Sequence, residues 1–533
     1  MNTELIYRLA PSKMNFGSLL LHNSSGFLFE YDIKKMELQR KEFDVYFSCG
    51  LFSIIQFKKS TTLETIISFE NGDSVCVNSL FHLSSYSIFY RMENLFIKLY
   101  DENSSHILLN KNEMNDYLNL SEEICYLEES KIESYNLWCV YLNKKKIVIH
   151  DRIIEFDDIV YISSNGIIFS KEEENYNDMF FLPFNEGKIY YLYFGRGTLI
   201  NAHMDSKSKK IILVTGINGE HEVYESFPPY RNWNAVKING KKKFGTVTPI
   251  TMNGKSALFI TGALEGIFLY LMEENEIIEI IKPKVNLIRS YDEGSHIKVT
   301  SLLSNKNSKL DVLFFHGGPE SSEWDNPRFP MIINRLSNIG IDFHIINYAG
   351  SKGYGKKYRT LVDKKILTGT VTPIINWINE NLTNKRLILI GGSFGATLAI
   401  EIYINKNKIH SDIDIICITN PLVDLNQHIN KSRKNGYDIT FFKRKFSDQD
   451  IESINIDRYK KEILKSDTKF IFLVGRHDEV ITPRPIIRLI KSLKNNNVII
   501  KLKADDGRHA DLMSSINREK YIVDFILGAI GVL

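Results

Sequence analysis

The sequence predicts a chain in two parts: an all-β region over residues 1–285, then an α/β region over residues 286–533 with a mostly parallel sheet. Two observations lead to this fold class. In the first region, short β-like runs are separated by turn signals, and long helical periodicity is hard to find. In the second region, apolar strands alternate with amphipathic helical segments, which is typical of a parallel sheet covered by helices on both faces.

The N-terminal region is expected to form antiparallel hairpins. Asn-Gly pairs accept the positive φ of tight hairpin turns. They occur at Asn71, Asn165, Asn218, Asn239 and Asn253. Hairpins over this length are compatible with one large sandwich, two barrels, or a β-propeller of roughly six or seven four-stranded blades. The turn pattern indicates an all-β region and leaves these three architectures open.

The C-terminal region follows a polar stretch at Ser304–Lys309 and predicts both strands and helices. The expected strands are Val312–Phe315, Phe343–Ile346, Leu387–Ile390, Ile413–Ile418, Phe470–Val474 and Val498–Ile500. The expected helices are Pro330–Ile339, Pro373–Leu382, Ala396–Ile404, Pro485–Leu493 and Ser515–Leu527.

Composition and charge narrow the class of protein. Hydrophobic residues make up 43% of the 533 positions and the net charge is only +3, as in soluble globular proteins. The basic runs Lys144–Lys146 and Lys241–Lys243 lie beside turn residues, which favours solvated turns over a nucleic-acid surface. Five cysteines without CxxC spacing favour a reducing compartment and no zinc site. Neither a leader pattern nor an apolar run of membrane length is present, so we expect a cytoplasmic protein without a membrane partner.

A nucleophile motif lies between a predicted strand and a predicted helix. Gly391-Gly-Ser-Phe-Gly395 has the pattern G-x-S-x-G, with the apolar run Leu387–Ile390 before it and Ala396–Ile404 after it. In this context the serine occupies a strained turn, and the flanking positions must be small because neighbouring chain passes close by. The motif predicts an α/β-hydrolase fold with Ser393 as the nucleophile.

The acid and the base are expected downstream, because in this fold the order along the chain is serine, acid, histidine. Asp478 follows the strand Phe470–Val474, and His509 follows the strand near Val498, shortly before the last helix. Glu479 is the alternative acid. His477 is rejected as the base because it is adjacent to Asp478, whereas a base belongs on a separate loop.

An oxyanion hole needs at least two preorganised N–H donors. The amide of Phe394, directly after the nucleophile, is one candidate. Gly317 and Gly318, which follow the strand Val312–Phe315, are the others, because glycines let the backbone approach a reacting carbonyl. No metal or cofactor is predicted, since HExxH and Cys/His clusters are missing from the sequence.

Together these motifs resemble the prolyl oligopeptidase family, especially its acylaminoacyl-peptidase-like and dipeptidyl-peptidase-like branches. The resemblance is carried by Phe315–Pro319, Asn347–Gly355, Gly391–Gly395, the Asp478 segment and Gly507–His509. It implies that the all-β region is a β-propeller that caps the active site and admits small or flexible peptides. Tyr348 and Tyr354 of the second motif are candidate substrate-binding residues.

The sequence departs from the family pattern at three places. Ala349 stands where the family often has arginine, Lys365–Thr370 replaces a Gly-Asp-x-Gly segment, and Ala396 replaces the second glycine after the serine motif. None of these departures affects the predicted triad, but they leave substrate preference open. Hydrolysis of peptide amides is the leading hypothesis. An esterase, a peptide-processing or cyclising acyltransferase, and a binding protein with a vestigial hydrolase domain are the alternatives.

Overall fold

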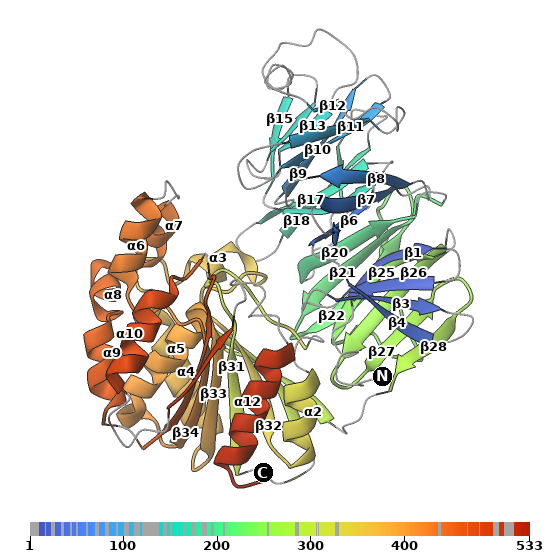
Figure 1. The fold of residues 1–533 in the computed structure, drawn as a ribbon. Coiled ribbons are helices and arrows are strands. Elements are labelled where there is room, and N and C mark those ends of the chain that lie inside the picture. Colours follow the sequence, from blue (N-terminus) through green and yellow to red (C-terminus); the bar gives the residue numbers. More distant parts are fainter. Residues whose placement is uncertain are drawn as a thin grey trace.

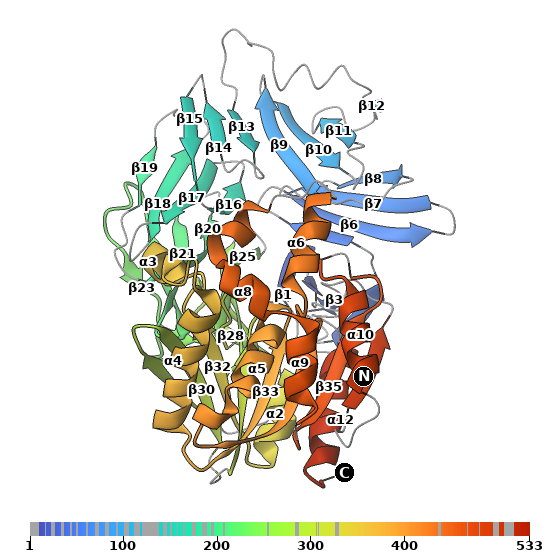
Figure 2. The same ribbon diagram turned by 90° about the vertical axis from the view of Figure 1, so that its left-hand side faces the viewer.

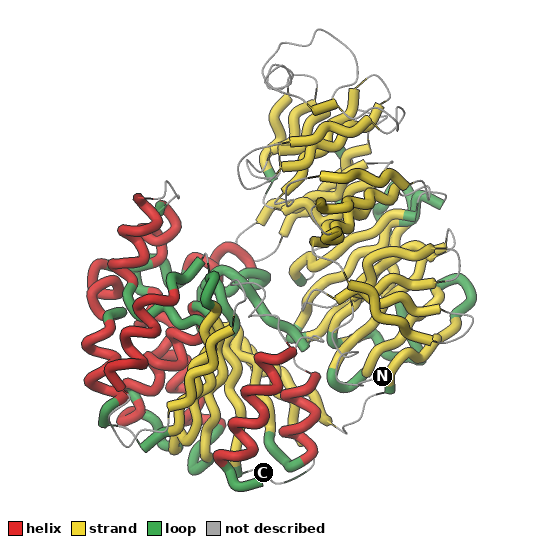
Figure 3. The backbone as a smooth tube through the Cα atoms, viewed as in Figure 1, coloured by secondary structure: helices red, strands yellow, loops and turns green. Residues whose placement is uncertain are grey.

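The computed structural model describes strand paths between residues 10 and 155, and the backbone and side chains of most residues from Phe156 to Val532. After residue 155, the longer stretches outside the described residues are 173–176, 184–188, 193–196, 283–286, 326–329, 435–438, 494–499 and 506–515. Strands fill the N-terminal part of the molecule, and helices gather in the C-terminal part (Figure 3).

Every element that the structure describes up to Ile281 is a strand (Figure 1). These strands form successive antiparallel sheets. The first two contain β1 (Ala10–Asn15), β2 (Ser18–His22), β3 (Phe27–Asp32) and β4 (Glu37–Glu42), then β5 (Val45–Ser48), β6 (Phe52–Lys59), β7 (Thr62–Phe69) and β8 (Ser74–Ser79). A larger sheet follows, with β9 (Ser85–Arg91), β10 (Asn94–Tyr100), β11 (His106–Asn110), β12 (Leu118–Asn119), β13 (Trp138–Tyr141), β14 (Lys146–Ile149) and β15 (Arg152–Glu155).

Three further antiparallel sheets complete this part. They contain β16 (Asp158–Ser163), β17 (Gly166–Glu172), β18 (Asn177–Pro183) and β19 (Tyr190–Tyr191); β20 (Thr198–Met204), β21 (Ile211–Ile217), β22 (Glu220–Ser226), β23 (Asn234–Ala235) and β24 (Lys243–Phe244); and β25 (Thr246–Met252), β26 (Lys255–Gly262), β27 (Gly266–Leu271) and β28 (Glu276–Ile281). Strand β1 of the first sheet lies beside β25 of the last (Figure 1). Successive antiparallel sheets whose first and last members adjoin are the arrangement of a β-propeller, which the family resemblance had favoured over a sandwich or two barrels.

The remaining strands form one eight-stranded sheet, in the order β29-β30-β32-β31-β33-β34-β35-β36. Its members are β29 (Leu287–Glu293), β30 (Ile297–Ser304), β31 (Leu310–Phe315), β32 (Asp342–Tyr348), β33 (Arg386–Gly392), β34 (Asp412–Thr419), β35 (Lys469–Gly475) and β36 (Ile500–Asp505). From β32 to β36 all pairings are parallel, whereas β29 and β30 are antiparallel additions at one edge. The expected parallel sheet is confirmed. The predicted boundary at 285/286 falls in a stretch outside the described residues and stays a prediction.

Helices cover both faces of this sheet (Figure 1), and Figure 2 shows one of the two helical layers in front of the strands. Alternation along β31 shows the two faces. Leu313 and Phe315 join a core with α4 (Ile366–Asn381), α5 (Phe394–Ile404), α9 (Ile456–Ile463) and α10 (Pro483–Leu493). Val312 and Phe314 join a core with α2 (Pro330–Asn338) and α12 (Ile516–Ala529). The other helices that the structure describes are α3 (Gly355–Thr360), α6 (Leu425–Lys434), α7 (Thr440–Lys445) and α8 (Asp448–Ser453). A 3-10 turn, Lys406–Lys408, follows α5.

Helix α4 differs from the prediction because it begins at Ile366, before the proline taken as its start. Pro373 lies inside the helix, and the departure segment Lys365–Thr370 forms its N-cap and first turn. Helices α3 and α6 to α9 were not predicted. They lie in stretches rich in charged and polar residues, where the apolar periodicity is short.

Candidate active site

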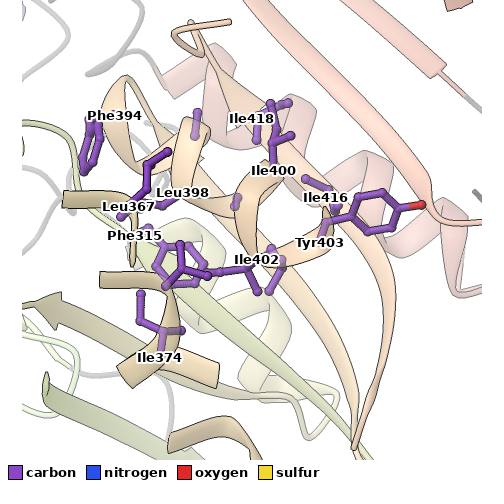
Figure 4. Close-up of a cluster of buried hydrophobic side chains, with 14 of the residues drawn as sticks. Phe315, Leu367, Ile374, Phe394, Leu398, Ile400, Ile402, Tyr403, Ile416 and Ile418 are labelled. Carbon is purple, nitrogen blue, oxygen red and sulfur yellow. The ribbon is translucent and has the colours of Figure 1, made fainter. Parts of the chain in front are cut away.

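Ser393 lies at a sharp turn between β33 and α5. Its backbone has φ 55° and ψ −123°, a conformation that costs free energy for a residue with a side chain. The chain after it enters α5, of which ten residues, Phe394 to Tyr403, are buried. Figure 4 shows side chains of this helix packed with Phe315 of β31. A helix buried on all sides holds the turn in place, and the Ser393 side chain stays half-buried rather than enclosed.

Two glycines make the turn possible. An added Cβ at Gly395 would lie 2.2 Å from the carbonyl oxygen of Phe315, and one at Gly391 would lie 2.3 Å from that of Gly395. Real Cβ atoms do not approach backbone oxygen so closely. The G-x-S-x-G motif therefore has the steric cause that was inferred from the sequence, and the first residue of α5, Phe394, presents an N–H without an acceptor in the helix.

Gly317 lies directly against the serine. A Cβ added to it would be 3.3 Å from Ser393 Cβ and 3.9 Å from Ser393 Oγ. Gly318, next in the chain, has φ 125°, which favours glycine. The structure thus brings Gly317, one of the two predicted loop glycines, to the turn that carries the predicted nucleophile.

His316 holds the peptide that joins these glycines. Its Nδ1 lies 2.6 Å from the carbonyl oxygen of Gly317, and because carbonyl oxygen only accepts, Nδ1 carries the proton. Burial lowers the pKa of His316 to about 4, so the imidazole is neutral near pH 7. Its Nε2 faces Ser351 Oγ at 2.8 Å. Since a trans peptide is planar, the N–H of Gly318 points away from this histidine.

Tyr348 contacts the same loop through its hydroxyl group and its ring. Its hydroxyl lies 3.0 Å from the carbonyl oxygen of His316 and 3.3 Å from that of Gly317, and its ring stacks on the His316 ring at 4.4 Å. Burial raises its pKa well above the usual value, so the phenol keeps its proton and can donate. The side chain is fully buried. Tyr348 thus supports the glycine loop (Gly317 and Gly318) from a buried position, and its substrate-binding role stays a prediction.

Asp478 lies in the turn after β35 and is buried. Its Oδ1 accepts hydrogen bonds from the backbone N–H groups of Val480, at 2.9 Å, and Ile481, at 2.6 Å. These bonds fix the carboxylate on the loop that follows the strand, at the edge of the sheet where functional loops of α/β folds lie.

Asn420 directly follows β34 and lies between the turn of Ser393 and the turn that follows β35. The residue before it, Thr419, accepts the N–H of Ser393 at 2.9 Å through its carbonyl oxygen. Asn420 Oδ1 accepts the N–H of Gly475 at 2.9 Å, and its own N–H donates to Leu473. Sequence reasoning missed this residue. The sequence feature that could have indicated it is the pair Asn420-Pro421 directly after an apolar strand. Asparagine is favoured at such a turn because it tolerates a positive φ, and Asn420 has a φ of 46°.

The predicted base, His509, and the alternative acid, Glu479, lie outside the described residues. Strand β36, which precedes His509, pairs with β35, which precedes Asp478. Tyr354 is half-buried; its ring stacks on Trp324 at 5.7 Å, and its substrate-binding role stays a prediction.

Two properties of the described residues bear on other classes of site. No group of three or more His, Cys, Asp or Glu side chains in this part of the chain is placed to hold a metal ion. Among the described helices, none has both the length and the apolar character needed to cross a bilayer.

Comparisons with known proteins agree with this architecture. Residues 327–531 match the sequence model of the prolyl oligopeptidase family. A puromycin-hydrolyzing peptidase of Mycobacterium tuberculosis has a TM-score of 0.66 at 9% identity, covering 99% of this chain and 96% of that one. The acylaminoacyl peptidase of Pyrococcus horikoshii has a TM-score of 0.63 at 11% identity, covering 97% and 95%. Dipeptidyl peptidase 4 of Porphyromonas gingivalis has a TM-score of 0.57 at 9% identity, covering 98% and 87%.

No curated protein sequence is significantly similar to the chain. The structural similarities, at such low identity, establish the fold, and the family match supports a serine peptidase. The family resemblance drawn from the motifs is therefore confirmed: the C-terminal part of this chain matches the prolyl oligopeptidase family, and the whole chain shares the fold of solved peptidases with a β-propeller and an α/β-hydrolase domain.

Proposed function

We propose that the chain is a serine peptidase that cleaves amide bonds of small or flexible peptides through an acyl-enzyme. The observation that carries the proposal is the strained backbone of Ser393, held at the start of a buried helix with Gly317 against it. Strain of this kind persists only where the surrounding structure imposes it, and a nucleophile elbow is the use to which α/β-hydrolases put it.

The proposed mechanism assigns one role to each residue. His509 takes the proton from Ser393 Oγ as that oxygen attacks the substrate carbonyl, and Asp478 orients the imidazole. The N–H groups of Phe394 and of Gly317 or Gly318 stabilise the oxyanion of the tetrahedral intermediate. Because the N–H of Gly318 points away from the buried His316, we favour it as the donor from this loop. As the intermediate collapses, His509 gives the proton to the leaving nitrogen and the amine is released; water then hydrolyses the acyl-enzyme.

Labelling with a fluorophosphonate probe tests the nucleophile. The wild-type protein should label at one site, and Ser393→Ala should not label. Ser492→Ala is the matched control, since the Ser492 hydroxyl donates to the carbonyl oxygen of Leu489 within α10 and its removal should leave labelling unchanged. A folded wild-type protein that does not label would support the binding protein with a vestigial hydrolase domain.

The remaining triad members are tested by kinetics. Asp478→Asn and His509→Ala should each lower kcat by about 10⁴-fold, as loss of a triad member does in serine peptidases, while leaving the protein folded. If His509→Ala retained the activity of the wild type, the base would have to be another residue.

A substrate panel separates the enzymatic alternatives. N-acyl-aminoacyl and aminoacyl anilides, short peptides and simple esters would be offered to the same preparation. Turnover of peptides and anilides supports the peptidase; turnover of esters alone would support an esterase. An acyl product lighter by one water than the linear hydrolysis product, formed together with the released amine, would indicate cyclisation.

A further inference from the structure

The glycine loop beside Ser393 is held at its downstream end by an ionic cluster. Glu320, two residues after Gly318, receives Lys445 at 2.7 Å, Arg444 at 2.8 Å and Arg359 at 3.2 Å, all on Oε1. Burial acts to raise the pKa of Glu320, but Lys445 and the two arginines lower it below its usual value, so the carboxylate is ionised near neutral pH. An added Cβ at Gly318 would lie 2.9 Å from the backbone nitrogen of Glu320, which shows how closely the loop folds here.

Lys445, at the end of α7, is the most enclosed member of this cluster. Its side chain is fully buried, and its Nζ lies 2.6 Å from Asp363 Oδ1 and 2.8 Å from the carbonyl oxygen of Arg359, in addition to Glu320. A buried ammonium needs such partners, because removing it from water is costly. Its three oxygen acceptors therefore fix its position, and Lys445 in turn fixes Glu320.

The next residue along the chain, Phe446, contacts the other side of the site. Its ring packs edge-to-face on the ring of Phe394 at 6.0 Å between centroids, and both side chains are buried. Phe394 is the first residue of α5 and follows Ser393 directly. Two adjacent residues, Lys445 and Phe446, thus contact the two separate segments that carry the expected oxyanion donors.

We propose that Lys445 and Phe446 act as a strut that sets the spacing between the two donors of the oxyanion hole. Lys445 fixes the loop of Gly318 through Glu320, and Phe446 fixes the start of α5 through Phe394. Both are positioning residues for the reaction, and this inference rests on the proposed peptidase function.

Spacing between the donors matters because the loop cannot set it alone. Glycine restricts backbone conformation less than any other residue, and Gly317 and Gly318 are adjacent. Donors act on the transition state only when they already lie about 2.7–3.1 Å from the position of the developing oxyanion. His316 and Tyr348 hold the upstream end of the loop, and the strut supplies the downstream restraint that the glycines lack.

Two variants test the strut. Glu320→Gln keeps the shape of the side chain and removes its charge, and Phe446→Leu removes the ring that contacts Phe394. Each should lower kcat by about tenfold or more, below the 10²–10³-fold expected for loss of a whole donor, with KM nearly unchanged. Because one strut is disturbed in both, the double variant should lose less than the product of the two single losses.

The affinity for a peptide aldehyde with the sequence of the best substrate distinguishes the strut from a merely structural role, which would leave this affinity unchanged. The hemiacetal of the aldehyde with the serine places an oxygen in the oxyanion hole, so the affinity should fall by the same factor as kcat/KM. The affinity for the corresponding product peptide should stay at the wild-type value.

Glu401→Gln is the matched control for a general loss of stability. Glu401 is a buried carboxylate on α5, bonded by Arg458 at 2.6 and 2.9 Å and by Tyr459 at 2.8 Å. This variant should lower the unfolding temperature and leave kcat unchanged. Wild-type kcat in folded Glu320→Gln and Phe446→Leu, or equal losses of affinity for aldehyde and product, would overturn the strut. Absence of fluorophosphonate labelling in the wild type would instead refute the proposed function itself.

Discussion

Gly317 and Ser393 lie in contact at the ends of adjacent strands, with room for hydrogen but little room for a methyl group. A Cβ on Gly317 would be 3.3 Å from Ser393 Cβ and 3.4 Å from the carbonyl oxygen of Gly392. These separations are tighter than ordinary carbon contacts, so either the loop or the serine would have to move by a few tenths of an ångström.

Gly317→Ala is therefore expected to fold and to react slowly. Displacements of this size spoil the alignment of nucleophile and donors, and we expect kcat/KM to fall roughly tenfold. The rate of fluorophosphonate labelling and the turnover of the best peptide substrate measure the effect. Full activity in this variant would mean that the loop can relax without moving any reacting group.

Gly395→Ala should have a larger effect that includes stability. The added Cβ would lie 2.2 and 2.4 Å from the carbonyl oxygens of Phe315 and His316, which are backbone atoms of a central strand and of the glycine loop. We expect labelling to be lost and the protein to be destabilised by about 2 kcal/mol or more. Gly528→Ala is the control: nothing lies within 4 Å of its Cβ position on α12, and this change should stabilise by about 0.5–1 kcal/mol. Urea unfolding of both variants gives the comparison.

The nucleophile turn could be predicted from sequence because its causes are local. An apolar run, a G-x-S-x-G motif and a second apolar run are contiguous, and the steric need for glycine at positions 391 and 395 follows from the turn itself. The parallel strands were predicted for the same reason, since each is a continuous apolar segment.

Residues that act through long-range contacts left no comparable signal. Lys445 belongs to a basic stretch, and such a stretch predicts solvent exposure. Its side chain is nevertheless fully buried, because Glu320 and Asp363 from distant segments pair with it. Tyr348 was predicted to contact substrate from its place in a motif. Whether a tyrosine in such a motif faces the solvent or the core depends on its sheet neighbours, which the motif does not encode.

Arg289 is expected to be one of the residues on which the folded state depends most. Its buried guanidinium on β29 pairs with Glu220 and Glu265 of the propeller sheets and with Asp325, which follows the glycine loop. Arg289→Met would leave these carboxylates without their shared cation and should destabilise by about 3–5 kcal/mol at pH 7.

The matched control for Arg289 is Arg386→Met, because Arg386 pairs with Asp414 while remaining 58% exposed. Loss of an exposed pair should cost less than about 1 kcal/mol. Urea unfolding at pH 7 measures both variants. Equal costs would show that the Arg289 cluster contributes no more than a surface pair.

Stability should fall as the pH is lowered from 7.5 to 5, and His344 should account for part of this change. Burial lowers the pKa of His344 on β32 to about 3, with Lys385 acting in the same direction. The unfolded chain, where the imidazole has its usual pKa of about 6.5, binds a proton that the folded chain does not. The stabilising effect of a neutral His344 is therefore complete above about pH 6.5 and decreases as the pH falls toward 3.

His344→Gln removes this titration and should flatten the pH dependence. Relative to its own stability at pH 7.5, the variant should lose about 2 kcal/mol less than the wild type at pH 5, because one proton per molecule corresponds to about 1.4 kcal/mol per pH unit. Urea unfolding at both pH values gives the difference, and His410→Gln, which replaces an exposed imidazole, should follow the wild type. Identical pH profiles for His344→Gln and wild type would mean that the buried imidazole takes up a proton in the folded protein, with Ser301 Oγ, 2.8 Å from its Nδ1, as the nearest acceptor.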